Sequence, residues 1–330
     1  MTNRASGPRP RVVILAEDGQ PRPYNLDAIK ARADVVIAPA ADLPQAIRGA
    51  DALFLWDFFS SALRDAWPQA DALKWVHVAA AGVDAMLFDG LRDSEVELTN
   101  AHGTFDRPIA EFVLASILAH DKQLYRSKAL QRQATWMHRE LTPTAGSRVL
   151  VVGTGGIGRA TARLLRAVGL EVRGAGRTAR EYDDDFGSVV PSAELAEHAG
   201  WADHVVLIAP LTDQTRQMLN AEVLAVMKPT AHLVNVGRGA LVDEPALIAA
   251  LRAGRIAAAS LDVFDQEPLP ADHPFWATEN VHISAHMSGD VVGWRDALAD
   301  QFLANLDRWL AGEPLANQVD KERGYVSSRG

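Results

Sequence analysis

Short apolar runs alternate with amphipathic segments along most of the chain, and this alternation is typical of parallel α/β units. In the first hundred residues the predicted strands are Arg11–Leu15, Val35–Ile37, Ala52–Leu55, Lys74–Val78 and Val96–Thr99. Amphipathic pieces at Leu43–Arg48 and Ser61–Ala66 lie between these runs.

Two long helices are predicted next, at about Pro108–His120 and Lys122–Met137. The first contains FVLASILA, which is apolar almost all round, so we expect that helix to be buried. A second α/β series begins at Arg148, with predicted strands at Arg148–Val152, Glu171–Gly174, His204–Ile208, His232–Val236, Ala257–Leu261 and Val281–Ile283. Its predicted helices are Ile157–Val168, Ala221–Met227 and Glu244–Ala253, followed by a closing helix at Val292–Leu310. We expect the polar tail, 313–330, to lie on the surface or against a neighbouring chain.

Composition narrows the class of protein. The 330 residues are enough for two domains, and 48% hydrophobic with 23% charged residues is the range of a globular protein. The net charge of −9 offers no basic stripe for nucleic acid, and no apolar run approaches the length of a membrane span. The absence of cysteine excludes disulfides, cysteine metal sites and thiol nucleophiles. We expect a cytoplasmic protein. We also expect no metal, because the histidines lack metal-ligand spacing.

The segment RVLVVGTGGIGRATARLL carries a glycine-rich loop between a predicted strand and a predicted helix. Gly153 permits a tight turn, Gly155 lets the backbone approach a pyrophosphate, and Gly158 allows the helix to pack closely on the strand. The N-terminus of that helix supplies N–H groups and positive potential for a phosphate. This context favours a dinucleotide site over a βα turn without a ligand.

The end of the second strand in this series bears on the choice of dinucleotide. NAD sites place a carboxylate there to accept from the ribose hydroxyls, whereas NADP sites place cations for the 2′-phosphate. Here Gly176, Arg177 and Thr178 occupy the strand end, with Arg180 close by and the first acid only at Glu181. We therefore favour NADP, with NAD possible; a solvated basic loop is the alternative interpretation.

Three polar residues follow three predicted strands of the second series: Arg238 in NVGRG, Glu267 in LDVFDQEP and His286 in HISAHMSGD. Ligands of parallel sheets bind at the carboxyl ends of the strands, so all three are expected on the edge that carries the glycine loop. A guanidinium can hold the carboxylate of a 2-oxo acid, and a histidine can give a proton to its carbonyl oxygen. A carboxylate on the other ring nitrogen would fix the tautomer of that histidine. Alone, each residue could be a surface or structural group.

From about residue 11 onward the chain resembles the D-isomer-specific 2-hydroxyacid dehydrogenase family, and it is most similar to the glyoxylate/hydroxypyruvate reductase branch. The motifs that carry the resemblance are AAAGVD, NAHGTFDRPIAEFVL, VVGTGGIGRA, LTDQTRQML, NVGRGALVDE, LDVFDQEPLP and SAHMSGD. The resemblance implies two doubly wound parallel-sheet domains, with a Rossmann cofactor domain at 102–287 inserted into a flavodoxin-like substrate domain at 1–101 and 288–330. It also implies a homodimer.

The resemblance further assigns residues to the site. The catalytic triad of the family falls on Arg238, Glu267 and His286, and its carboxamide-contacting acid falls on Asp262. The other implied cofactor contacts are Gly153, Thr154, Gly155, Gly156, Ile157, Gly158, Arg177, Thr178, Pro210, Thr215 and Val236. The implied substrate contacts are Trp56, Ala81, Gly82 and Val83 together with Arg238 and His286, the backbone N–H groups of 81–83 facing the anion.

Two departures from the branch concern the substrate rather than the reaction: Ala80 replaces a frequent Ser, and His102 replaces a frequent Arg or Asn. The loops around Trp56, Ala81 and Trp294 are expected to shape the pocket for the substrate side chain. The predicted activity is reduction of a small 2-oxo acid, of the glyoxylate or hydroxypyruvate type, to the D-2-hydroxy acid. The alternative is a dinucleotide-sensing, corepressor-like binding module, against which an intact triad argues. Formate dehydrogenases of this family carry Gln at the position of Glu267, which argues against that activity. The length of the chain argues against a phosphoglycerate dehydrogenase.

Overall fold

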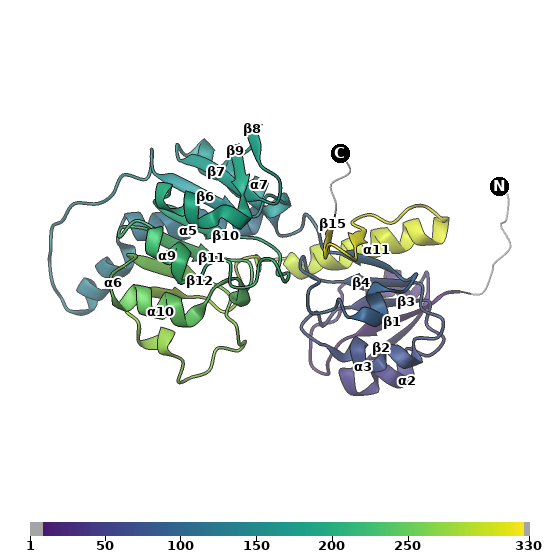
Figure 1. Cartoon of the computed structure of the whole chain (residues 1–330). Coiled ribbons are helices and arrows are strands. Elements are labelled where there is room, and N and C mark those ends of the chain that lie inside the picture. The colour runs from purple at the N-terminus through teal and green to yellow at the C-terminus, as the bar shows by residue number, and fades with distance from the viewer. Residues whose placement is uncertain (1–8, 327–330) are drawn as a thin grey trace. The chain divides into compact units, whose positions relative to one another are not determined.

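Two parallel sheets organise the chain in the computed structural model, which describes residues 9–326 (Figure 1). The chain divides into a first unit, formed by residues up to Thr104 and from Val292 onward, and a second unit, Phe105–Val291. The predicted α/β class, with two doubly wound sheets, is confirmed. No helix within residues 9–326 is long and apolar enough to cross a membrane.

The first unit is built on a five-stranded sheet of order β2-β1-β3-β4-β5, the flavodoxin-like order. Its strands are β1 (Arg11–Leu15), β2 (Asp34–Ala38), β3 (Ala52–Leu55), β4 (Trp75–Val78) and β5 (Glu97–Asn100), all parallel. Its helices are α1 (Leu26–Lys30), α2 (Leu43–Ala46), α3 (Ala62–Ala66), α4 (Asp89–Arg92) and α11 (Trp294–Ala311). The predicted strands of this half are therefore all present, whereas the short α1 and α4 left no periodic signal.

Alternation along the strands sends side chains to two helical layers. Leu53 and Leu55 of β3 join the core beneath α2 and α3, whereas Phe54 points to the other face. There Phe302 of α11 stacks on Phe54, with ring centroids 4.1 Å apart, and on Trp75, at 5.1 Å. This aromatic sandwich anchors the C-terminal helix to the N-terminal sheet, so the first unit is discontinuous in sequence.

The described part of the tail folds back on the first unit. The strands β14 (Val319–Asp320) and β15 (Tyr325–Val326) form a small hairpin, and Gln318 bridges to Thr99 of β5. The Lys321 ammonium donates to the carbonyls of Leu91 and Val96. Up to Val326 the polar tail thus packs on its own unit; the rest of the predicted tail lies outside the described residues.

The second unit contains an eight-stranded sheet of order β13-β12-β11-β10-β6-β7-β9-β8, in which only β8 is antiparallel to its neighbour. The strands are β6 (Arg148–Val152), β7 (Glu171–Gly176), β8 (Arg180–Asp183), β9 (Gly187–Pro191), β10 (His204–Leu207), β11 (His232–Asn235), β12 (Ala258–Leu261) and β13 (Val281–Ile283). The helices are α5 (Asp106–Asp121), α6 (Leu124–Arg132), α7 (Gly156–Ala167), α8 (Leu195–His198), α9 (Ala221–Val226) and α10 (Glu244–Arg252). The chain order reverses between β6 and β10, and ligands bind at such a switch point.

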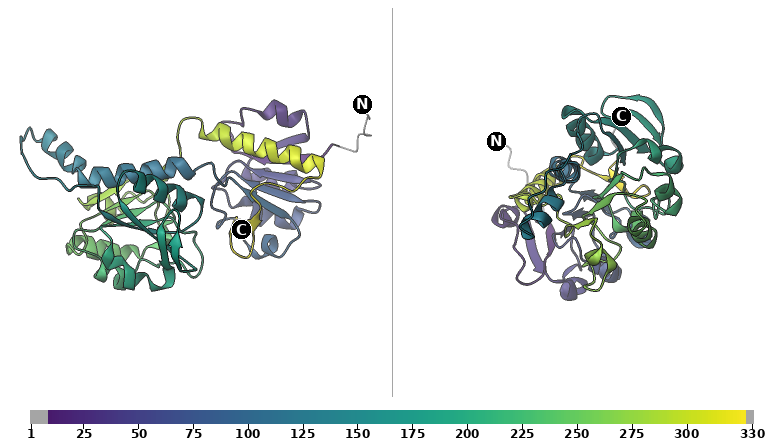
Figure 2. Two further views of the ribbon diagram at one scale, coloured as in Figure 1. Left: turned by 90° about the horizontal axis from the view of Figure 1, so that it is seen from above. Right: turned by 90° about the vertical axis from the view of Figure 1, so that its left-hand side faces the viewer.

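One predicted helix is shorter than its pattern suggested. Gln123, with φ 46°, separates α5 from α6, and α6 ends at Arg132 before Ala134, with φ 51°. The prediction of a helix over Lys122–Met137 is therefore wrong at both ends, because two left-handed residues interrupt it. Figure 2 shows α6 and the segment after it extending away from the sheet of the second unit.

Candidate active site

The loop after β11 holds Arg238 by hydrogen bonds between side chains and the backbone. The Asn235 amide donates to the Arg238 carbonyl at 2.9 Å, and the Gly237 N–H donates to the Asn235 side-chain oxygen at 3.1 Å. The Arg238 guanidinium donates to the carbonyl of Gly237 at 2.8 Å. The side chain of Asn235, the last residue of the strand, thus fixes the turn that presents the guanidinium.

Gly239 brings this loop against the next one. A Cβ atom at Gly239 would lie 1.8 Å from the backbone carbonyl carbon of Phe264, which no other residue could tolerate. Phe264 lies in the loop after β12 that carries Glu267. The glycine after Arg238 is therefore a packing requirement, and it places the guanidinium and carboxylate loops side by side.

Glu267 and His286 form the central pair of the site. The Nδ1 atom of His286 lies 2.7 Å from Oε2 of Glu267, and the Phe264 N–H donates to Oε1 at 2.9 Å. The two side chains are 33% and 30% exposed, so the pair is open to a ligand on one side. Burial raises the pKa of the Glu267 carboxyl. Hydrogen bonds from His286 and Phe264 and the charges of His286 and Arg238 lower this pKa by more, so it lies below its ordinary value.

The ionised Glu267 decides which nitrogen of His286 faces it as a donor. A carboxylate only accepts hydrogen bonds, so Nδ1 must carry a hydrogen. The proton that His286 can exchange with a ligand is therefore the one on Nε2. This is the arrangement that a histidine acid or base needs.

Asp262 positions the loop of His286. Its buried carboxylate accepts from the Ser284 hydroxyl at 2.6 Å and from the N–H groups of Met287 and Ser288 at 3.0 and 2.9 Å. Its carbonyl accepts from the His286 N–H at 2.8 Å. His286 itself has φ 49°, a conformation that side-chain-bearing residues rarely adopt and that tends to occur at functional sites. The sequence motif assigned Asp262 a contact with the cofactor and did not predict this role in holding the loop of His286.

The glycine loop has the geometry that a pyrophosphate requires. Gly153 has φ 118°, and a Cβ there would lie 2.7 Å from the Ala209 backbone nitrogen; a Cβ at Gly158 would lie 1.9 Å from the Gly153 carbonyl oxygen. At Gly155, in contrast, no atom lies within 4 Å of where a Cβ would be. Two glycines are thus needed by the fold, and the third leaves open space at the N-terminus of α7. The residues present fit a dinucleotide phosphate.

The end of β7 carries the residues expected to choose the cofactor. Arg177 and Thr178 directly follow Gly176, the last residue of the strand. Arg180 is turned the other way, since its Nε donates to the buried Asp183 at 2.9 Å. Arg159 of α7 donates to the same carboxylate, so Arg180 belongs to an ion-pair network under the β8–β9 hairpin.

The other expected cofactor residues lie on the same sheet. Thr215 Oγ1 donates to the Pro210 carbonyl at 2.7 Å in the loop after β10. Val236 follows β11 and is 7% exposed. Thr154, Gly156 and Ile157 belong to the glycine loop and the first turn of α7.

The expected substrate residues Trp56, Ala81, Gly82 and Val83 belong to the first unit. The loop at 79–83 follows β4, and within residues 9–326 the N–H groups of Ala81, Gly82 and Val83 have no hydrogen-bond acceptor in the chain. Three successive unused N–H groups suit an anion. Trp56 is only 6% exposed, and its indole N–H donates to the Pro21 carbonyl at 2.7 Å, so its edge is already engaged.

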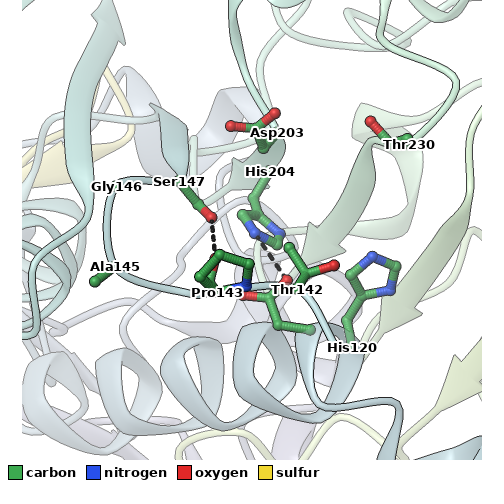
Figure 3. Close-up of a pocket in the computed structure, with 10 residues that line it drawn as sticks. His120, Thr142, Pro143, Ala145, Gly146, Ser147, Asp203, His204 and Thr230 are labelled. Carbon is green, nitrogen blue, oxygen red and sulfur yellow. Dashed lines mark hydrogen bonds and ion pairs between the residues drawn. The ribbon is translucent and has the colours of Figure 1, made fainter. Parts of the chain in front are cut away.

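A second polar cluster lies at the opposite, amino edge of the sheet in the second unit. His204 and His232 begin β10 and β11, with Nδ1 atoms 3.4 Å apart, and His120 of α5 stacks on His232 at 4.4 Å. A pocket of about 320 Å³ beside them is lined by His120, Asp121, Ser147, Asp203 and His204 among others (Figure 3). In the described part of the chain no group of His, Asp and Glu could hold a metal ion. The pocket is separate from the triad, because His204 and His232 begin their strands whereas Arg238, Glu267 and His286 follow the ends of theirs.

Comparison with known proteins adds an independent line of evidence. The family described as "D-isomer specific 2-hydroxyacid dehydrogenase, NAD binding domain" matches residues 114–288. A glyoxylate reductase of Thermofilum pendens is 31% identical over 95% of each chain. A D-isomer specific 2-hydroxyacid dehydrogenase of Xanthobacter autotrophicus, solved with NADPH, is 33% identical and covers 96% of this chain and 100% of its own, with a TM-score of 0.82. An NADPH-dependent glyoxylate/hydroxypyruvate reductase of Sinorhizobium meliloti, solved with NADP and sulfate, is 28% identical over 96% of this chain and 100% of its own, with a TM-score of 0.82.

Proposed function

Because the chain belongs to the D-isomer specific 2-hydroxyacid dehydrogenase family, whose members are oxidoreductases acting on CH–OH groups, we propose that it reduces a small 2-oxo acid to the D-2-hydroxy acid. Acids of the glyoxylate or hydroxypyruvate type are the first substrates to assay. The observation that carries the proposal is the 2.7 Å contact between His286 and Glu267, beside Arg238 and on the same sheet as the glycine loop.

Each member of the triad has a task that its geometry supports. The Arg238 guanidinium holds the substrate carboxylate, and its rigid loop fixes the orientation of the ketone. The Nε2–H of His286 donates a proton to the carbonyl oxygen as that oxygen gains negative charge. Glu267 keeps the ring oriented and stabilises the charge that the ring carries before it donates. When bound, the dinucleotide supplies the hydride.

The first unit supports the same reaction as a substrate-binding unit, with the second unit as the cofactor-binding one. The unused N–H groups of Ala81, Gly82 and Val83 would bind the substrate carboxylate, and Trp56 would lie under the substrate as a buried wall rather than as a donor. Asp262 would contact the nicotinamide carboxamide from its position directly after β12.

We propose NADP as the preferred dinucleotide, with NAD as a weaker ligand. Arg177 and Thr178 would contact the 2′-phosphate, and the related enzymes of Xanthobacter and Sinorhizobium were solved with NADPH and NADP. Replacing Arg177 by Ser should weaken NADPH binding about 10-fold and leave NADH binding nearly unchanged, as measured by protein fluorescence. An equal loss for both dinucleotides would contradict the assignment.

A homodimer in the cytoplasm completes the proposal. Residues 122–140 carry five cations, namely Lys122, Arg126, Lys128, Arg132 and Arg139, in a chain whose net charge is −9. Trp136 is 99% exposed in this basic segment, which fits contact with the acidic surface of a second copy. Sedimentation should show a dimer, and Trp136→Ser should weaken it. A monomeric parent would contradict the proposed dimer. Cell fractionation tests the location.

The reaction is tested by oxidation of NADPH and NADH in parallel with glyoxylate and hydroxypyruvate. We expect turnover of at least one acid, faster with NADPH. His286→Ala should lower kcat by several orders of magnitude while the far-ultraviolet circular dichroism stays that of the parent. Unchanged turnover in this variant would remove the proposed acid.

A further inference from the structure

Three aromatic side chains gather at the carboxyl edge of the sheet in the first unit. Phe58 and Phe59 follow β3, with ring centroids 4.6 Å apart, and Phe58 meets Trp294, the first residue of α11, at 5.9 Å with the rings nearly perpendicular. Phe59 is 66% exposed, and the other two are partly exposed. We call Phe58, Phe59 and Trp294 the aromatic cluster.

The aromatic cluster neighbours the unused N–H groups of the loop after β4. The strands β3 and β4 are adjacent and parallel, with Leu55 opposite Val78, and the Ala79 N–H donates to the Leu55 carbonyl at 3.1 Å (Figure 1). Adjacent strands lie about 4.8 Å apart, so the two loops leave the sheet side by side. Phe58, Ala80 and Val83 also pack against the same hydrophobic core.

The exposed surface of these rings does not contribute to the core of the first unit. The buried side of the edge is already filled by Trp56, which meets Phe54 edge to face and is 6% exposed. Phe59 lies beyond it and leaves two thirds of its surface open. Exposed apolar groups that gather beside convergent polar groups mark ligand sites. The cation nearest to the cluster, Arg295, lies over the Trp294 ring at 4.4 Å.

We infer that the 2-oxo acid taken by this enzyme carries a large apolar, preferably aromatic, side chain, which lies on Phe58, Phe59 and Trp294 while the N–H groups of Ala81–Val83 hold its carboxylate. The inference rests on the proposed reaction and extends its substrate range beyond the smallest acids. Glyoxylate has no side chain and would leave the rings uncovered. Hydroxypyruvate would place a hydroxyl against apolar rings, which do not replace the hydrogen bonds that the hydroxyl makes with water.

The experiment compares kcat/KM, with NADPH, for four acids: glyoxylate, hydroxypyruvate, phenylpyruvate and 2-oxoglutarate. We expect phenylpyruvate to exceed glyoxylate about 10-fold or more, since filling an apolar pocket discriminates on this scale. A higher value for glyoxylate would overturn the inference and leave the proposed reaction standing. A highest value for 2-oxoglutarate would overturn it in favour of Arg295. If no acid is reduced, both proposals fail.

Variants separate the aromatic cluster from the rest of the unit. Phe59→Ala, at the most exposed of the three rings, should lower the ratio of phenylpyruvate to glyoxylate kcat/KM about 10-fold without loss of stability. Phe58→Leu, which keeps an apolar group in the partly buried position, should lower the ratio less. Tyr24→Leu is the matched control, because Tyr24 is 63% exposed in the same unit and contacts Asp300 instead of the cluster. A ratio that is the same in Phe59→Ala and in the parent would overturn the inference.

Discussion

The carboxyl edges of the two sheets differ in the kind of group that they present. In the second unit the edge carries ionisable side chains, Arg238, Glu267 and His286, each held by backbone hydrogen bonds or close packing. In the first unit the corresponding edge presents uncharged N–H groups at 81–83 and exposed aromatic rings. Under the proposed function, similar parallel sheets serve different purposes: the edge of the second unit fixes charge for chemistry, and the edge of the first unit offers a surface for recognition.

The two units also differ in the groups that pack closely. In the second unit glycines at the edge let backbone segments meet, at Gly239 against Phe264 and at Gly158 against Gly153. In the first unit the rings of Phe54, Phe302 and Trp75 stack within the sheet and under α11. A side chain added at Gly158 or Gly239 should therefore disturb the fold of the second unit, whereas substitutions among the edge rings of the first unit should mainly change selectivity.

The largest expected effect is on kcat, and it comes from removing the charge of Glu267 in the second unit while keeping the shape of its side chain. Glu267→Gln keeps the size of the side chain, but an amide cannot accept from both His286 and Phe264 in the way that the carboxylate does. We expect kcat to fall on the order of 1,000-fold, within the range for acid–base catalysts, while substrate KM changes little. Steady-state kinetics provide the measurement.

The matched control is the same substitution in the first unit. Glu97→Gln alters a carboxylate that accepts from Gln318 at 2.8 Å, and it should leave kcat near that of the parent. If Glu267→Gln behaves as Glu97→Gln does, the division between a chemical edge and a recognition edge is wrong.

The next effect concerns packing at the glycine loop. In Gly158→Ala the new methyl would meet the Gly153 carbonyl oxygen at 1.9 Å, so backbone must move, and we expect a loss of about 3 kcal/mol in the free energy of unfolding. Gly155→Ala meets nothing within 4 Å; it should unfold as the parent does but bind NADPH about 10-fold more weakly, because the methyl occupies the space for the phosphate. Denaturant unfolding and fluorescence titration measure the two effects.

Gly90→Ala provides the comparison in the first unit. Its methyl would meet the Trp67 indole at 2.7 Å, and a side chain can move aside where backbone cannot. We expect a smaller loss of stability than for Gly158→Ala, and a larger one would refute the contrast between the units.

The strands were predictable because each one is a short run of apolar residues in the sequence. Arg11–Leu15, Ala52–Leu55, Arg148–Val152 and Val281–Ile283 have the predicted bounds, since runs of apolar residues in a parallel sheet are buried on both faces. The hairpin of β8 and β9 was not predicted. Its segment contains the acids Asp183–Asp185, and acids are usually exposed. Asp183 is nevertheless buried, because it pairs with Arg159 of α7. Contacts made across the sequence leave no periodic signal.

The candidate site shows the same division. The residue types and their places after strands predicted that Arg238, Glu267 and His286 share one edge of the sheet, and the structure brings Glu267 and His286 into contact. The sequence could not predict that Asp262 binds the loop of His286, or that Arg180 turns to Asp183, because both depend on partners from other loops. The loops around Trp56, Ala81 and Trp294 were expected to shape the pocket, but the contact of Phe58 with Trp294 was not predicted, since these residues lie more than 200 positions apart and meet only in the folded unit.

The smallest effect concerns acid, and it again differs between the units. The second unit contains three histidines whose pKa burial lowers, His120, His232 and His282, and the pKa of His282 falls to about 4. The first unit contains one, His77, whose pKa burial lowers to about 3. The unfolded chain takes up these protons near pH 6.5, whereas in the folded chain His282 is protonated only near pH 4 and His77 only near pH 3. Stability is therefore complete above pH 6.5 and falls as the pH decreases toward 4, more steeply in the second unit.

His282→Phe tests this difference, because Phe preserves the stacking on Tyr125, at 3.5 Å, and cannot be protonated. Between pH 7 and pH 5 the variant should lose about 1–2 kcal/mol less unfolding free energy than the parent, in the second unit only. His77→Phe should produce the corresponding change in the first unit only. Denaturant-dependent hydrogen exchange, read peptide by peptide, resolves the two units at each pH. Equal acid dependence of both units in the parent would show that the buried histidines do not set it, because three groups in one unit and one in the other cannot give the same slope.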